Sequence, residues 1–289
     1  MRIDTHQHYW RYTPDEYDWI DERMAVIRRD CLPAEAAREM AGVGFDAAIA
    51  VQARQSIEET RALLAFADTH PFIAGVVGWV DLRSSSVEAD LEALARHPKL
   101  VGVRHVVQGE PDDFLYDAAF RRGISTLATF NLTYDVLIYE RQFPAAIEFV
   151  RAFPDQPFVL DHLGKPDIRN GRRDAWARQM RGLARHPNVC CKLSGLATEA
   201  DWSSWTPELL RPYLDIALDA FGPDRLMIGS DWPVCTVAGS YERVMAVVLN
   251  WLGACSEHER AAMLGGNAQR FWSLPRVILS EPRGFSPVV

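Results

Sequence analysis

The stretch AAIAVQARQSIEETRALLAFADTHPFIAGVVGWV, residues 47–80, contains one complete strand–helix–strand unit. Two apolar runs, 47–54 and 72–80, flank a segment with helical features. Ser56 and Glu59 have the spacing of a capping box at the start of that segment. Apolar strands joined by a helix are typical of a parallel sheet whose outer face is covered by helices.

The same alternation continues along the chain. Further apolar runs lie at residues 2–8, 100–108, 132–139, 157–162, 188–195 and 225–231, which makes eight in all. Helix-like segments separate each pair, for example the segment that Thr206 and Pro207 open and Gly222 closes. Eight such units predict an α/β fold, a single (β/α)8 TIM barrel. No Pro/Gly/Ser-rich linker divides the chain, so we expect one domain over residues 1–289, with loop insertions at 9–32 and 196–206 on the C-terminal face.

The composition excludes several classes of partner. The chain has 31 Lys and Arg against 39 Asp and Glu, and its net charge of -8 comes without any basic run, so we expect no nucleic-acid partner. No apolar stretch approaches the length of a membrane span, so we expect no membrane partner. Five scattered cysteines without a CxxC pair argue against a disulfide framework and favour a soluble, cytoplasmic protein. The oligomeric state stays open.

Two histidines one residue apart stand near the start of the chain, in IDTHQHYW (3–10). Side chains at positions i and i+2 of a strand point to the same face, so His6 and His8 are expected to converge. Two neighbouring imidazoles suggest a metal ion or a reacting carbonyl. The alternative is a pair of half-exposed polar residues on an edge strand.

The other histidines fall into two groups. His70, His97 and His186 each precede a proline or follow a helix at the turn into a strand, where they are expected to cap helices, and His258 lies on the polar side of a short helix. The remaining candidates lie at the C-terminal ends of predicted strands, which is the catalytic face of such barrels. This rim collects His6, His8, His105, His162, Lys165 and Asp231.

The alternation of side chains along a strand indicates which residues face the barrel interior. In LVGVRHVVQ (100–108), Val101, Val103 and Val107 are expected to face the helices, which leaves Arg104 inward and His105 outward. In AAIAVQAR (47–54), the same reasoning places Ile49 and Val51 toward the helices.

Further polar residues are expected at the mouth of the barrel. Gln52 faces the mouth by the same alternation, and Lys192 shares a face with Ser194 near the end of its strand. Together with Arg104 and Lys165, Lys192 predicts a cationic pocket for a polyhydroxylated or carboxylated small molecule. Buried salt bridges, with Asp135 as an available partner, are the alternative.

These motifs resemble the amidohydrolase superfamily, in particular its sugar-lactonase-like branch. The resemblance rests on HxH at residues 6 and 8, on His162 in DHLGKP, on Asp231 in GSDWPV and on the closing MLGGNAQRFW (263–272), so it spans essentially the whole chain. Members are (β/α)8 hydrolases of lactones, including L-fuconolactone and L-rhamnonolactone. The fourth strand has Arg104 and His105 where two-metal members place a bridging lysine, and residues 132–139 contain no histidine, so a two-metal centre is not expected.

The resemblance implies hydrolysis of a sugar-derived 1,5- or 1,4-lactone to the aldonic acid. Asp231 would be the general base, while His6, His8 and His162 polarise the carbonyl or hold, with Asp231, one zinc or other divalent ion that is not essential. The substrate would be bound by Arg104, Gln52, Lys165 and Lys192. The alternatives are a metal-dependent decarboxylase of an aromatic or unsaturated acid and a catalytically silent sugar-binding barrel.

Overall fold

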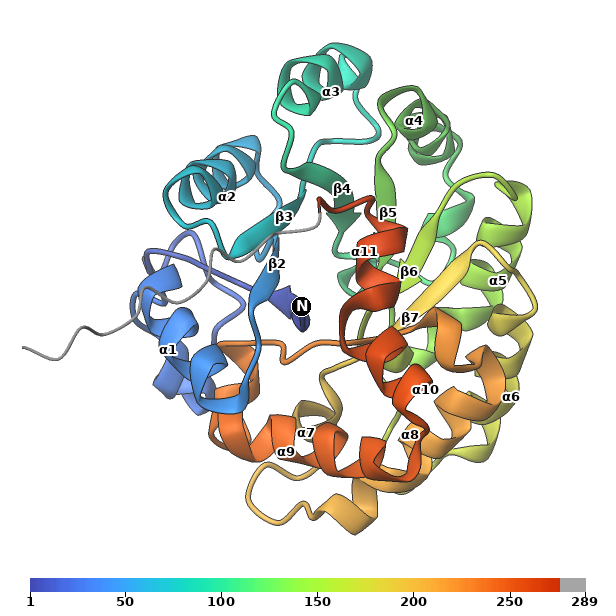
Figure 1. Cartoon of the computed structure of the whole chain (residues 1–289). Coiled ribbons are helices and arrows are strands. Elements are labelled where there is room, and N and C mark those ends of the chain that lie inside the picture. The colour runs from blue at the N-terminus through green and yellow to red at the C-terminus, as the bar shows by residue number, and fades with distance from the viewer. Residues whose placement is uncertain (276–289) are drawn as a thin grey trace, which may run out of the picture.

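Eight parallel strands form the centre of the molecule (Figure 1). The structure is a computed structural model and describes residues 1–275 of the 289. Neighbours in sequence are neighbours in the sheet, as a (β/α)8 barrel requires. The strands are β1 (Ile3–Gln7), β2 (Ala47–Val51), β3 (Ile73–Gly78), β4 (Leu100–His105), β5 (Thr133–Val136), β6 (Phe158–Leu160), β7 (Val189–Leu193) and β8 (Leu226–Ile228).

Helices connect each strand to the next and surround the sheet (Figure 1). They are α1 (Pro33–Val43), α2 (Ile57–Thr69), α3 (Val87–Ala95), α4 (Ala118–Leu127), α5 (Phe143–Ala152), α6 (Asp174–Ala184), α7 (Leu196–Glu199), α8 (Pro207–Phe221), α9 (Tyr241–Trp251), α10 (Glu257–Ala261) and α11 (Asn267–Phe271). The predicted TIM barrel is therefore confirmed. None of the helices within residues 1–275 has the length and apolar character that a membrane crossing requires.

The first and last strands meet at their C-terminal ends. Gln7 and Trp232 form a parallel bridge, and the backbone N–H of His8 donates to the Trp232 carbonyl at 2.7 Å. The backbone N–H of Asp231 donates to the His6 carbonyl at 2.9 Å. The closure of the barrel thus fixes the segment that carries His6 and His8 against the segment that carries Asp231.

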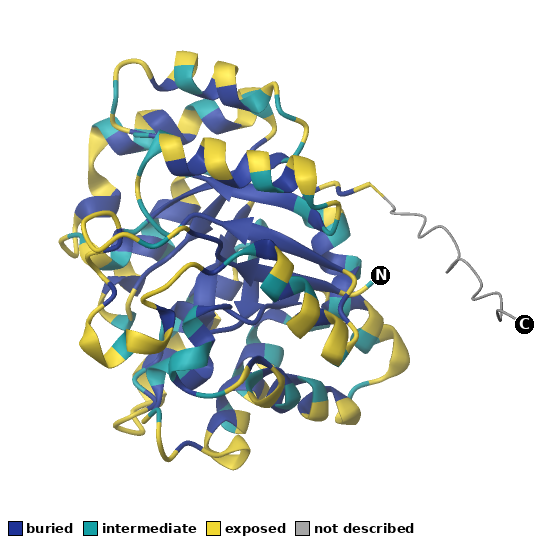
Figure 2. Cartoon of the chain, turned by 90° about the vertical axis from the view of Figure 1, so that its left-hand side faces the viewer, coloured by how far each residue is buried: buried dark blue, intermediate teal, exposed yellow. Residues whose placement is uncertain are grey.

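Apolar side chains form two separate clusters. The larger cluster joins the strands to the surrounding helices, and Figure 2 shows buried strands inside helices whose outer faces are exposed. The smaller cluster combines residues of six strands with Trp272, which follows α11, and a group drawn from strands all round a barrel lies inside it. Ile49, Val51 and Val101 belong to this inner cluster, so the prediction that they face the helices is wrong. Ala48 and Ala50 belong to the larger cluster, so the alternation along β2 is regular and the prediction chose the wrong face. In β4 the register shifts at Val101, which the pairing with Val76 and Val77 skips, and a simple count of alternating residues misses such an irregularity.

Helix ends largely follow the predicted signals. The side chain of Thr206 accepts a hydrogen bond from Leu209 N at the start of α8, and Gly222 ends that helix. Ser56 accepts from Glu59 N at the start of α2, but the Glu59 carboxylate instead accepts from the backbone N–H groups of Ala53 and Arg54. The expected capping box is therefore only half formed, because Glu59 binds the loop that leaves β2.

Residues 9–32 form the expected insertion above the barrel mouth. The segment contains only a short 3₁₀ helix, η1 (Glu22–Ile27), and its ends are joined by a bridge between Trp10 and Cys31. Glu16, Asp18 and Trp19 from its middle line a cavity at the mouth. The insertion therefore forms one wall of the candidate site.

Candidate active site

A cavity of about 300 Å³ opens at the C-terminal ends of the strands. Residues at or just beyond the ends of β1, β2, β4, β5, β6 and β8 line it together with the insertion. The lining residues are His8, Glu16, Asp18, Trp19, Ala53, Arg54, Gln55, Arg104, Val106, Gln108, Leu137, His162, Lys165, Asp231 and Val234.

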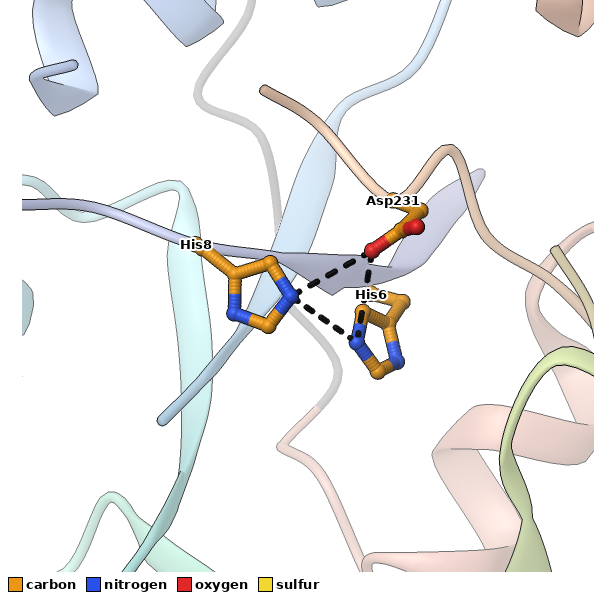
Figure 3. A group of neighbouring side chains, drawn as sticks. All are labelled: His6, His8 and Asp231. Carbon is orange, nitrogen blue, oxygen red and sulfur yellow. Dashed lines mark hydrogen bonds and ion pairs between the residues drawn. The ribbon is translucent and has the colours of Figure 1, made fainter. Parts of the chain in front are cut away.

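Three side chains converge at the base of this cavity (Figure 3). The Nε2 atoms of His6 and His8 lie 3.2 Å apart. Oδ1 of Asp231 lies 3.3 Å from His8 Nε2 and 3.8 Å from His6 Nε2. All three residues are buried, so the alternative interpretation of His6 and His8 as half-exposed residues on an edge strand is wrong.

The hydrogen-bond partners of the two histidines define their tautomers. His8 Nδ1 lies 2.8 Å from the carbonyl oxygen of Val51, which can only accept, so Nδ1 carries the proton and Nε2 has a free lone pair. His6 Nδ1 lies 3.4 Å from Asp161 Oδ1, which accepts, and 3.2 Å from Lys192 Nζ, which donates. Arg104 Nη1 can only donate and lies 3.2 Å from His6 Nε2, so this contact requires the proton on Nδ1, toward Asp161, and the lone pair on Nε2.

This donor set fits one divalent metal ion. Zinc bonds of about 2.0–2.1 Å in a tetrahedral arrangement place the ligand atoms about 3.3 Å apart, close to the distances among His6, His8 and Asp231. Two imidazole lone pairs and a carboxylate oxygen are suitable ligands. The carbonyl and carboxylate bonded to the far ring nitrogens hold both rings in the orientation that metal binding needs.

His162 lies beside this group, in a turn that places it there. The turn η6 (Asp161–Gly164) follows β6, and His162 adopts a left-handed backbone conformation with φ of 51°. Its Nε2 lies 3.8 Å from Asp231 Oδ1, and its Nδ1 lies 2.9 Å from Ser194 Oγ. Asp231 is also left-handed, with φ of 63°. Residues other than glycine in this region are strained, and such strain is concentrated at functional sites.

Burial controls the charges of the cluster. Desolvation lowers the pKa of His6 well below its usual range and lowers that of His162 to about 4, so both rings are neutral at pH 7. Burial alone would raise the pKa of Asp231, but attraction to the His162, His8 and His6 rings in their protonated form outweighs it and the pKa is lowered. Asp231 thus ionises before the imidazoles lose their charge as the pH rises, and an ionised carboxylate beside neutral imidazoles is the state that a metal site requires.

A buried network of charges lies beneath His6. Arg104 Nη1 donates to Asp161 Oδ2 at 2.9 Å, and Lys192 Nζ lies 2.9 Å from Asp161 Oδ1 and also pairs with Asp135. Burial would raise the pKa of Asp161, but Lys192, His6 and Arg104 lower it well below its usual range. The structural salt bridges considered as an alternative for Lys192 and Asp135 are thus present.

The eight predicted site residues divide into two layers. Five of them line the cavity, namely His8, Arg104, His162, Lys165 and Asp231. His6, Gln52 and Lys192 are fully buried and are not among the lining residues. His105 points away, because it stacks on Phe114 and pairs with Glu110 at 2.8 Å.

The cavity is not the cationic pocket that the sequence suggested, because each of its cations has an acidic partner. Arg54 pairs with Glu16 at 2.5 Å, and Lys165 pairs with Glu199 at 3.3 Å. The sequence analysis missed Arg54. It lies two residues after Gln52, beyond the C-terminal end of the same strand, and this position alone could have indicated that it lines the cavity. Trp19 gave no such signal, because no periodic pattern fixes the position of a side chain in a long loop.

The barrel and its His/Asp cluster define a class of protein. Residues 3–274 match the amidohydrolase family, so the chain belongs to that family, and the resemblance seen in the sequence is confirmed. The chain is 45% identical over 287 residues to L-fucono-1,5-lactonase of Burkholderia multivorans, with 95% of this chain and 97% of the relative covered. L-fucono-1,5-lactonase of Burkholderia ambifaria is 40% identical over 284 residues, with 96% and 97% covered.

The barrel also matches a solved structure over nearly its whole length. A crystal structure of an amidohydrolase from Burkholderia multivorans with bound zinc aligns with a TM-score of 0.92 and 44% identity. The alignment covers 95% of this chain and 100% of the other.

Proposed function

We propose that this protein is a lactonase that opens a sugar-derived 1,5- or 1,4-lactone, similar to fuconolactone, to the aldonic acid. One observation carries the proposal, namely 45% identity to an L-fucono-1,5-lactonase over 95% of the chain. The polar cavity at the C-terminal face of the barrel supports it.

The site holds one divalent ion, zinc, through His6, His8 and Asp231. The distances among these ligand atoms and the bound zinc of the related amidohydrolase support this assignment. When bound, such an ion polarises a carbonyl and lowers the pKa of a coordinated water.

Asp231 accepts the proton of the attacking water. Its shortest contacts with His6, His8 and His162 all use Oδ1. Because its pKa is lowered, the carboxylate is ionised at neutral pH but is a weak base toward free water. Proton removal therefore occurs as the water forms its bond to the lactone carbonyl, when that water becomes more acidic.

The walls of the cavity bind the sugar. Lys165 and Arg54 provide hydrogen-bond donors, and Glu16 and Asp18 provide acceptors for hydroxyl groups. Arg104 also lines the cavity, but its Nη protons are given to His6, Asp161 and Gln52. Trp19 and Leu137 add apolar surface. Paired cations and acids of this kind suit a neutral polyhydroxylated ring better than a highly charged ligand.

The product, an aldonic acid, fits a role in carbohydrate catabolism. Cys31, Cys190, Cys191, Cys235 and Cys255 are all free, which supports a reducing compartment such as the cytoplasm.

The test is a panel of aldonolactones followed with a pH indicator, because ring opening releases one acid. We expect turnover of at least one six-carbon lactone without release of carbon dioxide. Carbon dioxide from an aromatic or unsaturated acid would instead identify a decarboxylase. Inertness toward the whole panel combined with thermal stabilisation by a sugar would identify a silent binding barrel.

A further inference from the structure

We propose that Arg104 competes with the divalent ion for the Nε2 lone pair of His6 and so lowers the metal affinity of the site. This inference rests on the metal site proposed above and extends it to a residue outside the ligand set. Arg104 Nη1 lies 3.2 Å from His6 Nε2, the same atom that lies 3.2 Å from His8 Nε2.

The chemistry of an imidazole makes the two interactions exclusive. A neutral ring with its proton on Nδ1 has one lone pair on Nε2, which either accepts an N–H hydrogen bond or coordinates an ion. Because Arg104 Nη1 can only donate, its contact with Nε2 requires this tautomer. The Nδ1 proton then points to Asp161 Oδ1 at 3.4 Å, and Lys192 Nζ, 3.2 Å from Nδ1, gives its protons to Asp135 and Asp161. Both the guanidinium and the metal ion therefore require the same lone pair in the same protonation state.

Arg104 is held in place on its other side. Nη2 donates to the backbone carbonyl of Gln52 and lies 3.2 Å from Gln52 Oε1, and Nη1 donates to Asp161 Oδ2 at 2.9 Å. The side chain is 4% exposed. An ion bound to His6 would thus have a fixed positive charge beside it in a site with little water, and this repulsion weakens its binding.

The arrangement also keeps the site ordered without metal. The Arg104 hydrogen bond holds the His6 ring with Nε2 toward the cluster, so a cation is present there whether or not an ion is bound. In the metal-free protein, Arg104 supplies the positive charge that the ion would otherwise supply.

The experiment measures zinc affinity directly, by competition with a chromophoric chelator, on the full chain. In Arg104→Met the competing donor and its charge are removed, while Asp161 retains Lys192 at 2.9 Å. We expect zinc to bind roughly tenfold or more tightly than to the wild type, because a charge-assisted hydrogen bond no longer competes. Circular dichroism must show that the variant is folded, because unfolding would expose free cysteines that themselves bind zinc.

Arg54→Met is the matched control. Arg54 is a second arginine that lines the same cavity, but it pairs with Glu16 and stacks on Tyr17, with its guanidinium carbon 5.7 Å from the centre of that ring. We expect the zinc affinity of this variant to stay within about twofold of the wild type. The charge of Arg54 is offset by Glu16 and screened by water in the cavity, so removing it changes the energy of the bound ion little.

Zinc affinity of Arg104→Met equal to or weaker than that of the wild type would overturn the proposal. If circular dichroism shows that this variant does not fold, Arg104→Lys replaces it. Lysine keeps the charge but loses the planar fork, so a smaller tightening is expected, and no tightening would overturn the proposal. A wild-type protein that opens lactones but binds no zinc would also overturn it, and would leave the lactonase assignment intact.

Discussion

The backbone of Gly195 lies directly against the imidazole of His162. A Cβ at Gly195 would lie 2.8 Å from Cβ, Cγ and Nδ1 of His162, closer than real contacts allow. Gly195→Ala must therefore displace His162 from the cluster. Since small displacements of catalytic groups are costly, we expect kcat on the active lactone to fall by roughly tenfold or more.

Gly171→Ala controls for backbone strain. Gly171 has φ of 65°, close to the 68° of Gly195, but a Cβ there meets nothing within 4 Å. Both variants should lose about 1–2 kcal/mol of stability because both place a side chain in the left-handed region, and Gly195→Ala should lose more because of its contact with His162. Equal kcat values for the two variants would contradict a role of His162 in turnover.

The second prediction concerns Asp231. Asparagine keeps the shape of the side chain but cannot accept a proton at neutral pH, so Asp231→Asn should lower kcat on the order of a hundredfold or more. Circular dichroism should show a folded protein. A variant that retains more than a tenth of wild-type turnover would rule out Asp231 as the base.

The third prediction concerns metal removal. A lactone is an activated ester with an alkoxide leaving group, so it needs less Lewis-acid assistance than an amide does. We expect at most one zinc ion per chain by elemental analysis, and we expect most of the turnover to survive removal with a chelator. Loss of more than nine-tenths of the activity, restored by zinc or manganese, would instead make His6 and His8 obligatory metal ligands.

The fourth prediction concerns Glu59, which anchors the loop after β2. Burial raises its pKa from 4.5 to about 7, against the hydrogen bonds from the backbone of Arg54 and Ala53. Between these two values the folded state binds more protons than the unfolded state, so this carboxyl makes the free energy of unfolding fall as the pH rises. The whole effect amounts to roughly 3 kcal/mol.

Urea unfolding at pH 5 and at pH 8 tests this prediction. The stability of the wild type relative to Glu59→Gln should decrease between these values, because glutamine does not titrate. Parallel stabilities at both values would show that Glu59 titrates normally in the folded protein.

The order of the strands and the residues at the rim could be predicted from the sequence because both depend on local patterns. Apolar runs separated by capped helices identify the strands, and strands of a parallel barrel end at the same rim. His8, His162 and Asp231 follow strands in the sequence, so their meeting at one cavity required only the topology.

Depth within the barrel was harder to predict. Lys192 and Gln52 have the sequence context of cavity residues but are fully buried. Inside the barrel, Lys192 pairs with Asp135 and Gln52 contacts Arg104, and both partners come from other strands. The buried partners lie two strands away in the sheet and far away in the sequence, so no pattern within one segment indicates them. Val101 faces inward because an irregular register in β4 changes the alternation, whereas Ile49 follows a regular alternation whose inward face was chosen wrongly.

The closure of the barrel has a consequence for biosynthesis. His6 and Asp231 are 225 positions apart, yet the backbone of one binds the backbone of the other. At roughly 5–20 residues per second, a ribosome needs on the order of 10–50 s to pass from the first to the second. Throughout that interval β1 has no β8 to close against, and its two histidines lack their carboxylate partner. Catalytic activity therefore arises only when β8 has been synthesised and the barrel has closed. A nascent chain that stops before β8 contains His6 and His8 but lacks Asp231, so we expect it to be inactive.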